Sequence, residues 1–373
     1  MSKLDELIAE LCPDGVEYVR LAECCDIEDN KRKPVKSSLR IPGDTPYYGA
    51  NNIQDYVEGY THYGQYVLIA EDGSASLENY SVQYVDGFFW ANNHVHVIKG
   101  RKDLDTKFLY YYLTSFNFIP FLTGGTRAKL NKGNMEEIQI PVPPLPVQQE
   151  IVRILDNFTE LTAELTAELT AELTARRKQY EYYRDLLLTF GDEVEWMILS
   201  EIAEIGTGSS NTNEELEDGK YPFFVRSQEV RRKNTYEYDE TAIITSGDGV
   251  GVGKIFHYVE GKYALHQRAY RIHITDNRVI PKYYFYYMKS AFLPYIEKSS
   301  FHSSVTSIRR PMLNNFPVPV PPLKEQERIV AILDRFDALC NDLTSGIPAE
   351  IEARQKQYEY YRDKLLSFKE VKA

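Results

Sequence analysis

The chain has 373 residues, of which 43% are hydrophobic, and a formal net charge of −12 at pH 7. That length exceeds what one hydrophobic core usually organises, so two globular units are expected. No run of about 18 apolar residues occurs and the first residues lack the pattern of a signal peptide, which predicts a cytoplasmic protein without a membrane segment. The cysteines form no Cys-x-x-Cys pair and have no histidine at zinc-finger spacing, so neither a disulfide framework nor a metal site is expected. They are Cys12, Cys24, Cys25 and Cys340.

The first half begins with a short apolar segment at 18–27 and continues through stretches that favour β-strands. YVLIA at 66–70 and HVHVI at 94–98 combine β-branched and aromatic residues. FLYYYLTSF at 108–116 is compatible with a helix. These elements predict a mixed α/β domain over residues 1–143.

A proline-rich string, PVPPLP at 141–146, is predicted to stop regular structure, because a residue that precedes proline avoids the α region. A long amphipathic helix is predicted over 144–190, where apolar residues recur at spacings of three and four. TAEL occurs three times in tandem at 162–173. Each four-residue unit adds about 6 Å of helix, so the run is either low-complexity helix or a spacer whose copy number sets a distance. Its stripe of leucines comprises Leu161, Leu165, Leu169 and Leu173.

The second half repeats this order of elements. An apolar segment at 196–205 is followed by strand-like stretches at 241–245 and 269–274 and by an aromatic run at 283–292 that is compatible with a helix. These elements predict a second mixed α/β domain over residues 191–321.

A second proline-rich string, PVPVPPL at 317–323, precedes a second helix, predicted over residues 322–373. Its apolar positions repeat those of the first helix, 178 residues further along the chain. Gly346-Ile347-Pro348 is predicted to kink or restart this helix, with Pro348 in the first turn of the new segment. The stripe in this copy comprises Leu339, Leu343, Ile347 and Ile351.

The two halves are copies of one another. Residues 140–158 return at 318–336, and QYEYYRD at 179–185 returns at 357–363, so both blocks recur after 178 residues. Near-constant ends with diverged middles indicate one scaffold that presents two different surfaces to a pseudo-symmetric object, for which duplex DNA is the obvious candidate. The predicted fold class is α+β: two mixed α/β domains related by internal duplication, separated by two long antiparallel helices that form a coiled-coil-like spacer.

Basic residues gather in the two variable segments. Segment 226–310 has 14 Lys and Arg against 8 Asp and Glu, and segment 31–134 has 12 against 9, so the rest of the chain carries the acidic excess. Basic variable units on an acidic frame fit a protein whose globular parts contact phosphates while its frame contacts other proteins. For the first segment, a chance imbalance explains the count nearly as well.

Two features invite a catalytic interpretation. GDGVGVGK at 247–254 fails the phosphate-loop pattern, since Asp248 stands where the first glycine belongs, and a glycine-rich hairpin turn is favoured. In a self-contained endonuclease, the two acids Asp248 and Glu260 together with Lys262 would hold Mg²⁺ and activate water, but the first half has no lysine at the matching place. No Asn/Asp-Pro-Pro-Tyr/Phe string, with which an adenine-N6 methyltransferase grips its base, occurs. The chain is therefore predicted not to be an enzyme.

Three features of this sequence form a characteristic combination. They are the paired PVPPL…Q…I-V-x-I-L-D-x-F blocks, the TAEL run and the closing LTSGIPAEIEARQKQYEYYRDKLLSF at 343–368. Together they closely resemble the specificity subunit of type I restriction-modification enzymes, in the subtype with tandem TAEL repeats in the central conserved helix. The resemblance implies two target-recognition domains, each recognising one half of an interrupted DNA site, spaced by two antiparallel conserved helices.

The resemblance also implies partners. The helices would bind two copies of a modification subunit, an adenine-N6 methyltransferase that uses S-adenosylmethionine, and a motor-nuclease subunit that uses ATP and Mg²⁺ would complete the restriction complex. No cofactor is expected in this chain. Two alternatives remain: the endonuclease with Asp248, Glu260 and Lys262, and a coiled-coil scaffold whose variable units bind proteins and not nucleic acid.

Residues that contact DNA are predicted from charge clusters and from matched loops of the two halves. Phosphate contacts need clustered cations, and base recognition needs Arg for guanine and Asn or Gln for adenine. Solvated loop charge is an equally good explanation for any single cluster. The predicted DNA-binding residues are Lys31, Arg32, Lys33, Asn92, Asn93, His94, Arg127, Lys129, Asn131, Lys132, Arg231, Arg232, Lys233, Gln267, Arg268, Ser304, Thr306, Arg309 and Arg310.

Overall fold

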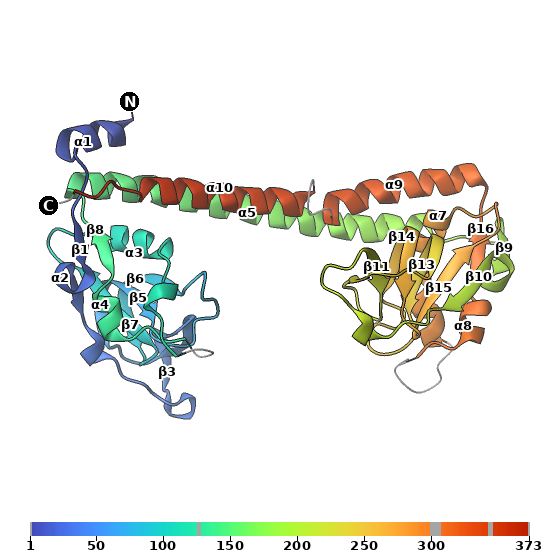
Figure 1. Cartoon of the computed structure of the whole chain (residues 1–373), viewed down its shortest axis with the longest axis horizontal. Coiled ribbons are helices and arrows are strands. Elements are labelled where there is room, and N and C mark those ends of the chain that lie inside the picture. Colours follow the sequence, from blue (N-terminus) through green and yellow to red (C-terminus); the bar gives the residue numbers. More distant parts are fainter. Residues whose placement is uncertain (1, 125–127, 299–306, 342–345, 372–373) are drawn as a thin grey trace. The chain divides into compact units, whose positions relative to one another are not determined.

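The computed structural model describes residues 2–124, 128–298, 307–341 and 346–371. It divides into two compact units. Unit 1 comprises Met1–Glu168 with Ile351–Ala373, and unit 2 comprises Leu169–Glu350. Figure 1 labels the helices and strands of each unit where there is room. None of the helices in the described ranges is both long enough and apolar enough to cross a lipid bilayer.

Unit 1 is built on a six-stranded mixed sheet with the order β2-β7-β5-β6-β3-β4. Only the pairing of β3 with β6 is parallel among these ladders. Both faces of the central strand β5 are covered, because successive side chains of a strand point to opposite faces: Val67 and Ile69 join one apolar cluster, and Leu68 joins another. The strands are β2 (Cys25–Ile27), β3 (Pro42–Gly49), β4 (Asn52–Val57), β5 (His62–Ala70), β6 (Val82–Ala91) and β7 (Val95–Gly100).

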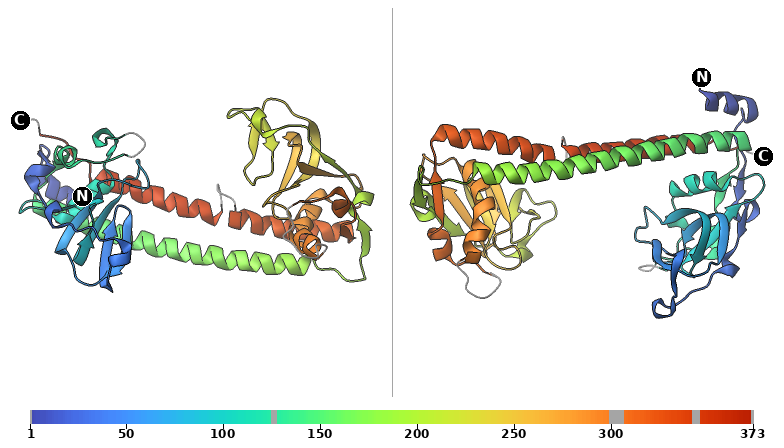
Figure 2. Two further views of the ribbon diagram at one scale, coloured as in Figure 1. Left: turned by 90° about the horizontal axis from the view of Figure 1, so that it is seen from below. Right: turned by 180° about the vertical axis from the view of Figure 1, so that it is seen from behind.

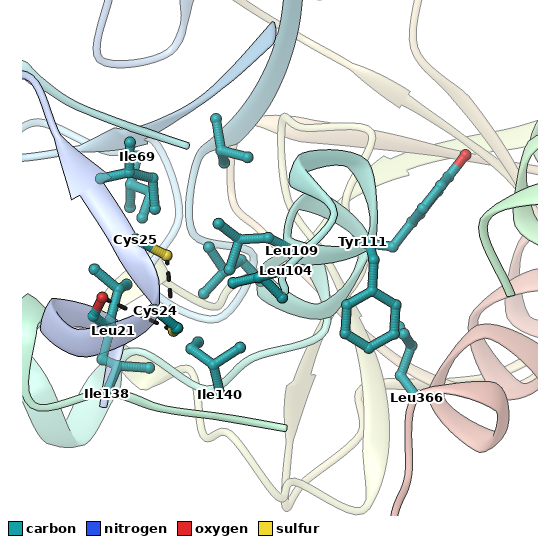
Figure 3. Close-up of a cluster of buried hydrophobic side chains, with 14 of the residues drawn as sticks. Leu21, Cys24, Cys25, Ile69, Leu104, Leu109, Tyr111, Ile138, Ile140 and Leu366 are labelled. Carbon is teal, nitrogen blue, oxygen red and sulfur yellow. Dashed lines mark hydrogen bonds between the residues drawn. The ribbon is translucent and has the colours of Figure 1, made fainter. Parts of the chain in front are cut away.

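Helix α3 (Thr106–Thr114) covers one face of this sheet. It begins at Asp105, whose side chain accepts hydrogen bonds from the amides of Lys107 and Phe108 and so satisfies two donors of the first turn. Figure 3 shows the core beneath it, which Leu366 joins from near the end of the chain. The four cysteines are free thiols, and all are buried. The other elements of this region are α1 (Lys3–Leu11), β1 (Tyr18–Arg20), α2 (Leu21–Cys24), α4 (Lys132–Glu136), β8 (Gln139–Pro141) and short 3-10 turns at Asp29–Lys31, Ser37–Leu39 and Ile119–Phe121.

Unit 2 has the same topology, with the sheet order β10-β15-β13-β14-β11-β12. The strands and helices predicted from local sequence are confirmed in both units, including the glycine-rich turn, which joins the antiparallel strands β13 and β14. The sheet strands are β10 (Ala203–Thr207), β11 (Tyr221–Phe224), β12 (Arg231–Lys233), β13 (Tyr238–Ser246), β14 (Phe256–Leu265) and β15 (Ala269–Ile274). Around them lie β9 (Glu195–Ile198), α6 (Leu199–Ile202), a 3-10 turn at Thr212–Glu214, α7 (Pro281–Lys298), α8 (Arg310–Asn314) and β16 (Pro317–Val320).

The second proline-rich string interrupts regular structure only at Pro321 and Pro322, and not over its whole length as predicted. Pro317 and Pro319 lie in β16, which forms a two-stranded antiparallel ladder with β9. Alternate residues of such a strand direct their amide groups away from the partner, so a proline at those positions removes no ladder hydrogen bond. The prolines therefore limit the ladder to two strands and do not abolish it.

Three long helices carry the repeated blocks: α5 (Leu145–Leu187), α9 (Leu323–Asn341) and α10 (Ile347–Leu365). The predicted restart is confirmed, because α10 begins at Ile347 with Pro348 in its first turn. In unit 1, α10 runs beside the first part of α5, with the rings of Phe158 and Tyr361 6.1 Å apart (Figure 2). In unit 2, the ring centroids of Phe336 in α9 and Tyr183 in α5 lie 5.8 Å apart. These two residues are the equivalents of Phe158 and Tyr361 in the other copy.

The predicted apolar stripe of these helices is wrong at one equivalent position in each copy. Leu161 is 60% exposed and Leu339 is 37% exposed, whereas Cys340 is 1% exposed. The residue four places after Phe158 is Thr162 and the one four places after Phe336 is Cys340, so the helix period of 3.6 residues turns these toward the partner helix in place of the leucines. Leu165, Leu169, Leu173 and Ile351 are half-buried, Ile347 is buried, and Leu343 lies outside the described residues.

A buried glutamine ties each helix to its sheet domain. Gln148 accepts a hydrogen bond from the amide of Asp105 at 2.8 Å and donates to the carbonyls of Asp103 and Pro143. Gln326 makes the same three contacts, with the amide of Ile280 and with two carbonyls, at 2.7 to 2.8 Å. Both glutamines have no exposed surface. This joint explains why the proline-rich string, the glutamine and the helix start recur together in the sequence.

Candidate nucleic-acid interface

Three segments meet at one end of the unit 1 sheet. They are the loop after β5, the turn before β7 and the segment before α4. The amide of Glu71 donates to the carbonyl of His94 at 2.9 Å, and the amide of Leu130 donates to the carbonyl of Glu71 at 2.8 Å. Asn92 closes the turn, since its side-chain oxygen accepts from the amide of His94 at 2.8 Å. Main-chain hydrogen bonds therefore hold the three segments together.

The same three segments meet in unit 2 through the same main-chain bonds. The amide of Gly247 donates to the carbonyl of Arg268 at 2.9 Å, and the amide of Ile308 donates to the carbonyl of Gly247 at 2.8 Å. His266 replaces Asn92, with its ring Nδ1 accepting from the amide of Arg268 at 3.0 Å. The two units thus share one surface framework and differ in the side chains that it carries.

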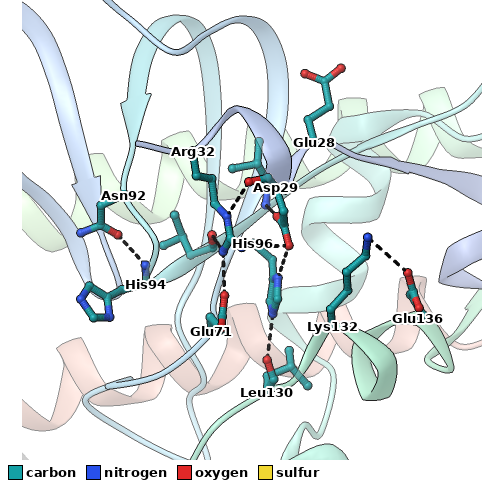
Figure 4. A network of polar contacts seen from close by, with 12 residues as sticks. Glu28, Asp29, Arg32, Glu71, Asn92, His94, His96, Leu130, Lys132 and Glu136 are labelled. Atoms are coloured by element: carbon teal, nitrogen blue, oxygen red, sulfur yellow. Dashed lines mark hydrogen bonds and ion pairs between the residues drawn. The ribbon is translucent and has the colours of Figure 1, made fainter. Parts of the chain in front are cut away.

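A buried polar network supports the surface of unit 1 (Figure 4). The ring of His96, 1% exposed, bridges Asp29 at 2.7 Å and the carbonyl of Leu130 at 2.8 Å. Burial opposes ionisation of Asp29, but the hydrogen bonds from His96 and from the amide of Val97 outweigh it and lower its pKa. In unit 2, Tyr270 takes the place of His96. These contacts fix the segment that precedes α4 onto the sheet.

Arg32 lies deeper than a phosphate-binding side chain requires. It is 16% exposed, contacts Glu71 at 2.7 Å and donates to the carbonyl of Val95 at 2.7 Å. Burial opposes ionisation of Glu71, but Lys129 and Arg32 outweigh it and lower its pKa. The network brings the segment 31–33 against the turn before β7, so this predicted cluster does join the site. Arg32 serves there as a support of the surface.

Several predicted DNA-binding side chains around the site of unit 1 contact carboxylates, and the carboxylate side chain of Asp72 is itself 39% exposed. His94 Nδ1 lies 2.6 Å from Asp72 Oδ1, Lys31 Nζ lies 2.6 Å from Glu28, and Lys129 Nζ lies 2.8 Å from Glu71. Lys132 reaches Glu136 at 3.7 Å. Asn92 is only 3% exposed and its amide is used inside the turn. Lys33, Asn93 and Asn131 are exposed, and Arg127 lies outside the described residues.

The site of unit 2 has arginines where unit 1 has histidine and lysine. Asp248 contacts Arg226 at 2.7 Å and Arg268 at 3.3 Å. Burial opposes ionisation of Asp248, but the hydrogen bond and charge of Arg226 outweigh it and lower its pKa. Gln267 Nε2 donates to Asn211 Oδ1 at 2.5 Å. Arg309 is exposed, Arg310 donates to the carbonyl of Ile205, and Ser304 and Thr306 lie outside the described residues.

The cluster Arg231-Arg232-Lys233 lies elsewhere, on the edge strand β12 of the unit 2 sheet. Arg231 contacts Glu215, Arg232 donates to the carbonyl of Gly219 at 2.6 Å, and Lys233, 14% exposed, contacts Glu214. Its place in the sheet corresponds to β4, and not to the segment 31–33 of unit 1. The structure therefore does not bring these two predicted clusters to equivalent places.

Sequence reasoning missed Arg226 and Asn211 as members of the unit 2 site, and Asp72 of the unit 1 site. Arg226 follows β11 and is near the turn only because β11 pairs with the end of β14 in parallel. A parallel pairing between strands far apart in sequence has no local signal. Asp72 had a signal, since it matches Asp248 in the duplicated turn.

The endonuclease hypothesis is wrong in its geometry. Asp248 follows the end of β13, while Glu260 lies on β14 opposite Thr241, four residues beyond Phe256 at the turn. Four residues of strand span about 13 Å, so the two carboxylates do not converge on one ion. Lys262 is directed to Asp239 at 4.0 Å. Within the described ranges, no group of three or more acidic, histidine or cysteine side chains is placed to hold a metal ion.

Fold and site together define a duplicated protein whose two units share one main-chain framework at the surface and carry different side chains on it. The family model of the type I restriction modification DNA specificity domain matches residues 13–175 and again 191–353, a shift of 178 residues that equals the repeat in the sequence. A putative type I restriction enzyme specificity subunit of Haemophilus influenzae is 46% identical over 376 residues, which cover 95% of this chain and 96% of that protein. A type I restriction enzyme specificity subunit of Escherichia coli is 40% identical over 294 residues, 70% of each chain.

Solved structures agree in fold. A chain from a study of assembly and conformational transition of the type I R-M system matches with a TM-score of 0.63 and 17% identity, covering 96% of this chain and 98% of that one. The S subunit from M. genitalium matches with a TM-score of 0.53 and 17% identity, covering 95% and 97%. The chain therefore belongs to the specificity subunits of type I restriction-modification systems. It is a DNA-recognition subunit without catalytic activity, and neither the endonuclease nor the protein-binding scaffold is favoured.

Proposed function

We propose that each unit of this chain recognises one half of an interrupted DNA site. The observation that carries the proposal is the shared framework: the same main-chain hydrogen bonds join three segments in both units, while the exposed side chains differ. A framework held by the main chain tolerates changes of side chain, as a surface that recognises two different half-sites requires. The target-recognition domains would span 1–143 and 191–321, with the conserved helices at 144–190 and 322–373.

Within this surface we assign the exposed cations to phosphates and the side chains of the turns to bases. Long cations reach phosphates in any sequence, whereas amides and guanidinium groups match the edges of adenine and guanine. The phosphate candidates are Lys31, Lys33, Lys129, Lys132, Arg309 and Arg310, and the base candidates are Asn93, His94, Asn131, Gln267 and Arg268.

The TAEL run would act as the spacer of this arrangement and define its subtype. The three units lie inside the continuous helix α5. Because each unit adds about one turn of helix, a change in copy number alters the helix length without changing either recognition surface.

Two copies of a modification subunit would bind the conserved helices. Large apolar side chains are exposed there at equivalent positions of the two copies: Tyr182 is 65% exposed and Tyr360 is 63% exposed, and Leu161 and Leu339 are exposed as well. In unit 1, Phe158 and Tyr361 line a hollow beside Leu161, and in unit 2 the equivalent residues Phe336 and Tyr183 line a hollow whose other walls differ. A repeated apolar patch on a helix surface is typical of a docking site for a repeated partner.

These partners would supply the chemistry. The modification subunit would carry S-adenosylmethionine and transfer a methyl group to adenine, and a motor-nuclease subunit would use ATP and Mg²⁺. Since chromosomal DNA and these cofactors are found there, the complex would work in the cytoplasm.

The proposal is tested by measuring how tightly the chain, together with its methyltransferase partner, binds DNA at increasing salt concentrations. Affinity should fall linearly on a log–log scale, because phosphate contacts release counterions, and Arg309→Gln should reduce the slope by about 1 without changing the preferred sequence. The chain alone should neither cleave nor methylate DNA. Metal-dependent cleavage by the chain alone, or binding that is insensitive to salt, would contradict the proposal.

A further inference from the structure

Asp248 is an acidic residue in the middle of a surface that is proposed to face DNA. A carboxylate repels phosphates, so its position there needs a reason. Its oxygens contact two guanidinium groups, Arg226 at 2.7 Å and Arg268 at 3.3 Å. The shorter contact neutralises the carboxylate, and Arg268 remains 60% exposed. Arg268 is thus restrained by a carboxylate and still accessible.

The main chain of Arg268 is also fixed. Its amide donates to the ring of His266 at 3.0 Å, and its carbonyl accepts from the amide of Gly247 at 2.9 Å. Only one guanidinium nitrogen, Nη1, contacts Asp248. A guanidinium has five N–H donors in a planar fork, so donors remain for a second, bidentate contact.

Unit 1 has the same arrangement at the equivalent place. Asp72 and Asp248 each lie two residues after a central strand, and His94 and Arg268 each lie one residue before the strand that pairs with it. His94 Nδ1 lies 2.6 Å from Asp72 Oδ1, and its ring is 47% exposed. The acid has therefore been kept in both units while the residue that it holds has changed.

We propose that Asp248 is a positioning residue that holds Arg268 for recognition of a guanine in the half-site contacted by unit 2, and that Asp72 positions His94 in unit 1 in the same way. The inference rests on the proposed function. Guanine presents O6 and N7, two acceptors that match two parallel N–H groups of arginine. The contact with Asp248 orders the guanidinium before DNA binds, so binding costs less conformational entropy. It also directs the guanidinium to the edge of the base and not to the phosphates.

Methylome sequencing of cells that produce the chain with its modification subunits tests this assignment. The wild-type motif should contain a guanine in one half-site that becomes degenerate in Arg268→Ala and in Arg268→Lys, since lysine keeps the charge but lacks the fork. Asp248→Asn and Asp248→Ser should relax the same guanine, and the double variant with Arg268→Ala should be no worse than Arg268→Ala alone. Asp72→Asn should relax one position of the other half-site only.

Binding to matched duplexes gives the magnitude. Arg268→Ala should lose roughly 5- to 150-fold of its preference for the guanine duplex, the range that a bidentate base contact provides. Asp248→Asn should lose less, roughly fivefold. Asp239→Asn, which removes a carboxylate of the same unit on the β13–β14 ladder, is the matched control and should keep the wild-type motif.

Other outcomes overturn the inference. A uniform loss of binding without a change of motif in Arg268→Ala would show a phosphate contact. An additive loss in the double variant, or relaxation at a cytosine, would show that Asp248 contacts a base itself. An unchanged motif in both Asp248 variants would show that the carboxylate positions nothing. If the wild-type complex produces no bipartite motif at all, the proposed function fails instead, so the two failures are distinguishable.

Discussion

Deletion of one TAEL unit, Thr166–Leu169, changes the length of α5 without touching either sheet domain. The deletion removes about 6 Å of helix and about 400° of rotation, which leaves the following residues turned by about 40°. Leu173 takes the place of Leu169, because the neighbouring unit has the same sequence. The apolar side of the helix therefore stays nearly in phase.

The expected result is a shorter gap between the two half-sites of the DNA. Six ångströms correspond to nearly two base-pair rises of about 3.4 Å, which sets the limit. Gly346, which lies outside regular structure directly before α10 begins at Ile347, gives the second helix a place to absorb part of the change. We therefore expect the gap to shrink by one base pair, with two as the geometric limit, while both half-sites keep their bases.

Methylome sequencing of cells that carry the shortened chain measures the gap directly. Glu168→Gln, which changes a residue of the same unit and keeps the helix length, is the control and should leave the gap unchanged. Deletion of only Ala167–Leu169 removes about 300° of rotation, so it should turn the apolar side by about 60° and lower stability. An unchanged gap in the four-residue deletion would mean that the run is passive, and altered half-site bases would mean that the separation of recognition and spacing is wrong.

Two further predictions concern the buried glutamine joint and the exposed tyrosines of the long helices. Gln326→Leu leaves three buried main-chain groups without a partner and should lower the free energy of unfolding by about 3 kcal/mol in urea, whereas the exposed Gln149→Leu should leave it unchanged. An equal effect of both changes would refute the role of the buried joint. Tyr182→Ala and Tyr360→Ala should each release one modification subunit, and the double variant both, as native mass spectrometry would measure; release of both subunits by either single change would contradict independent docking sites.

Local sequence was sufficient to predict the elements that a strand or helix pattern determines by itself. YVLIA at 66–70 and AYRIHI at 269–274 lie in β5 and β15, because a short run rich in β-branched and aromatic residues is a local signal for a strand. Because the two halves are copies, an element predicted in one half also predicts the equivalent element in the other half. The restart of the second helix at Ile347 was predictable from another local signal, because Gly346 disfavours a continuous helix and Pro348 suits a first turn.

The errors arose where a neighbour that is distant in sequence determines the structure or burial of a residue. The burial of Cys340 in place of Leu339 depends on which face of α9 meets the helix beside it, and both spacings are compatible with an apolar stripe. Pro317 and Pro319 extend a strand only because β9 offers a partner on the side where their missing amides are not needed. The place of Arg226 in the site follows from the parallel pairing of β11 with β14.

The division of labour between main chain and side chains explains how the two copies diverged without losing their fold. Stability rests on groups that both copies keep: the sheet order, the buried glutamine joints and the hydrogen bonds between the three surface segments. Even the cap of the turn is interchangeable, because Asn92 and His266 offer different acceptors to the same amide. The exposed positions beside that cap bear little of the fold's free energy, so the pair Asp72 and His94 in one unit and Asp248 and Arg268 in the other can change the chemistry of recognition at small structural cost.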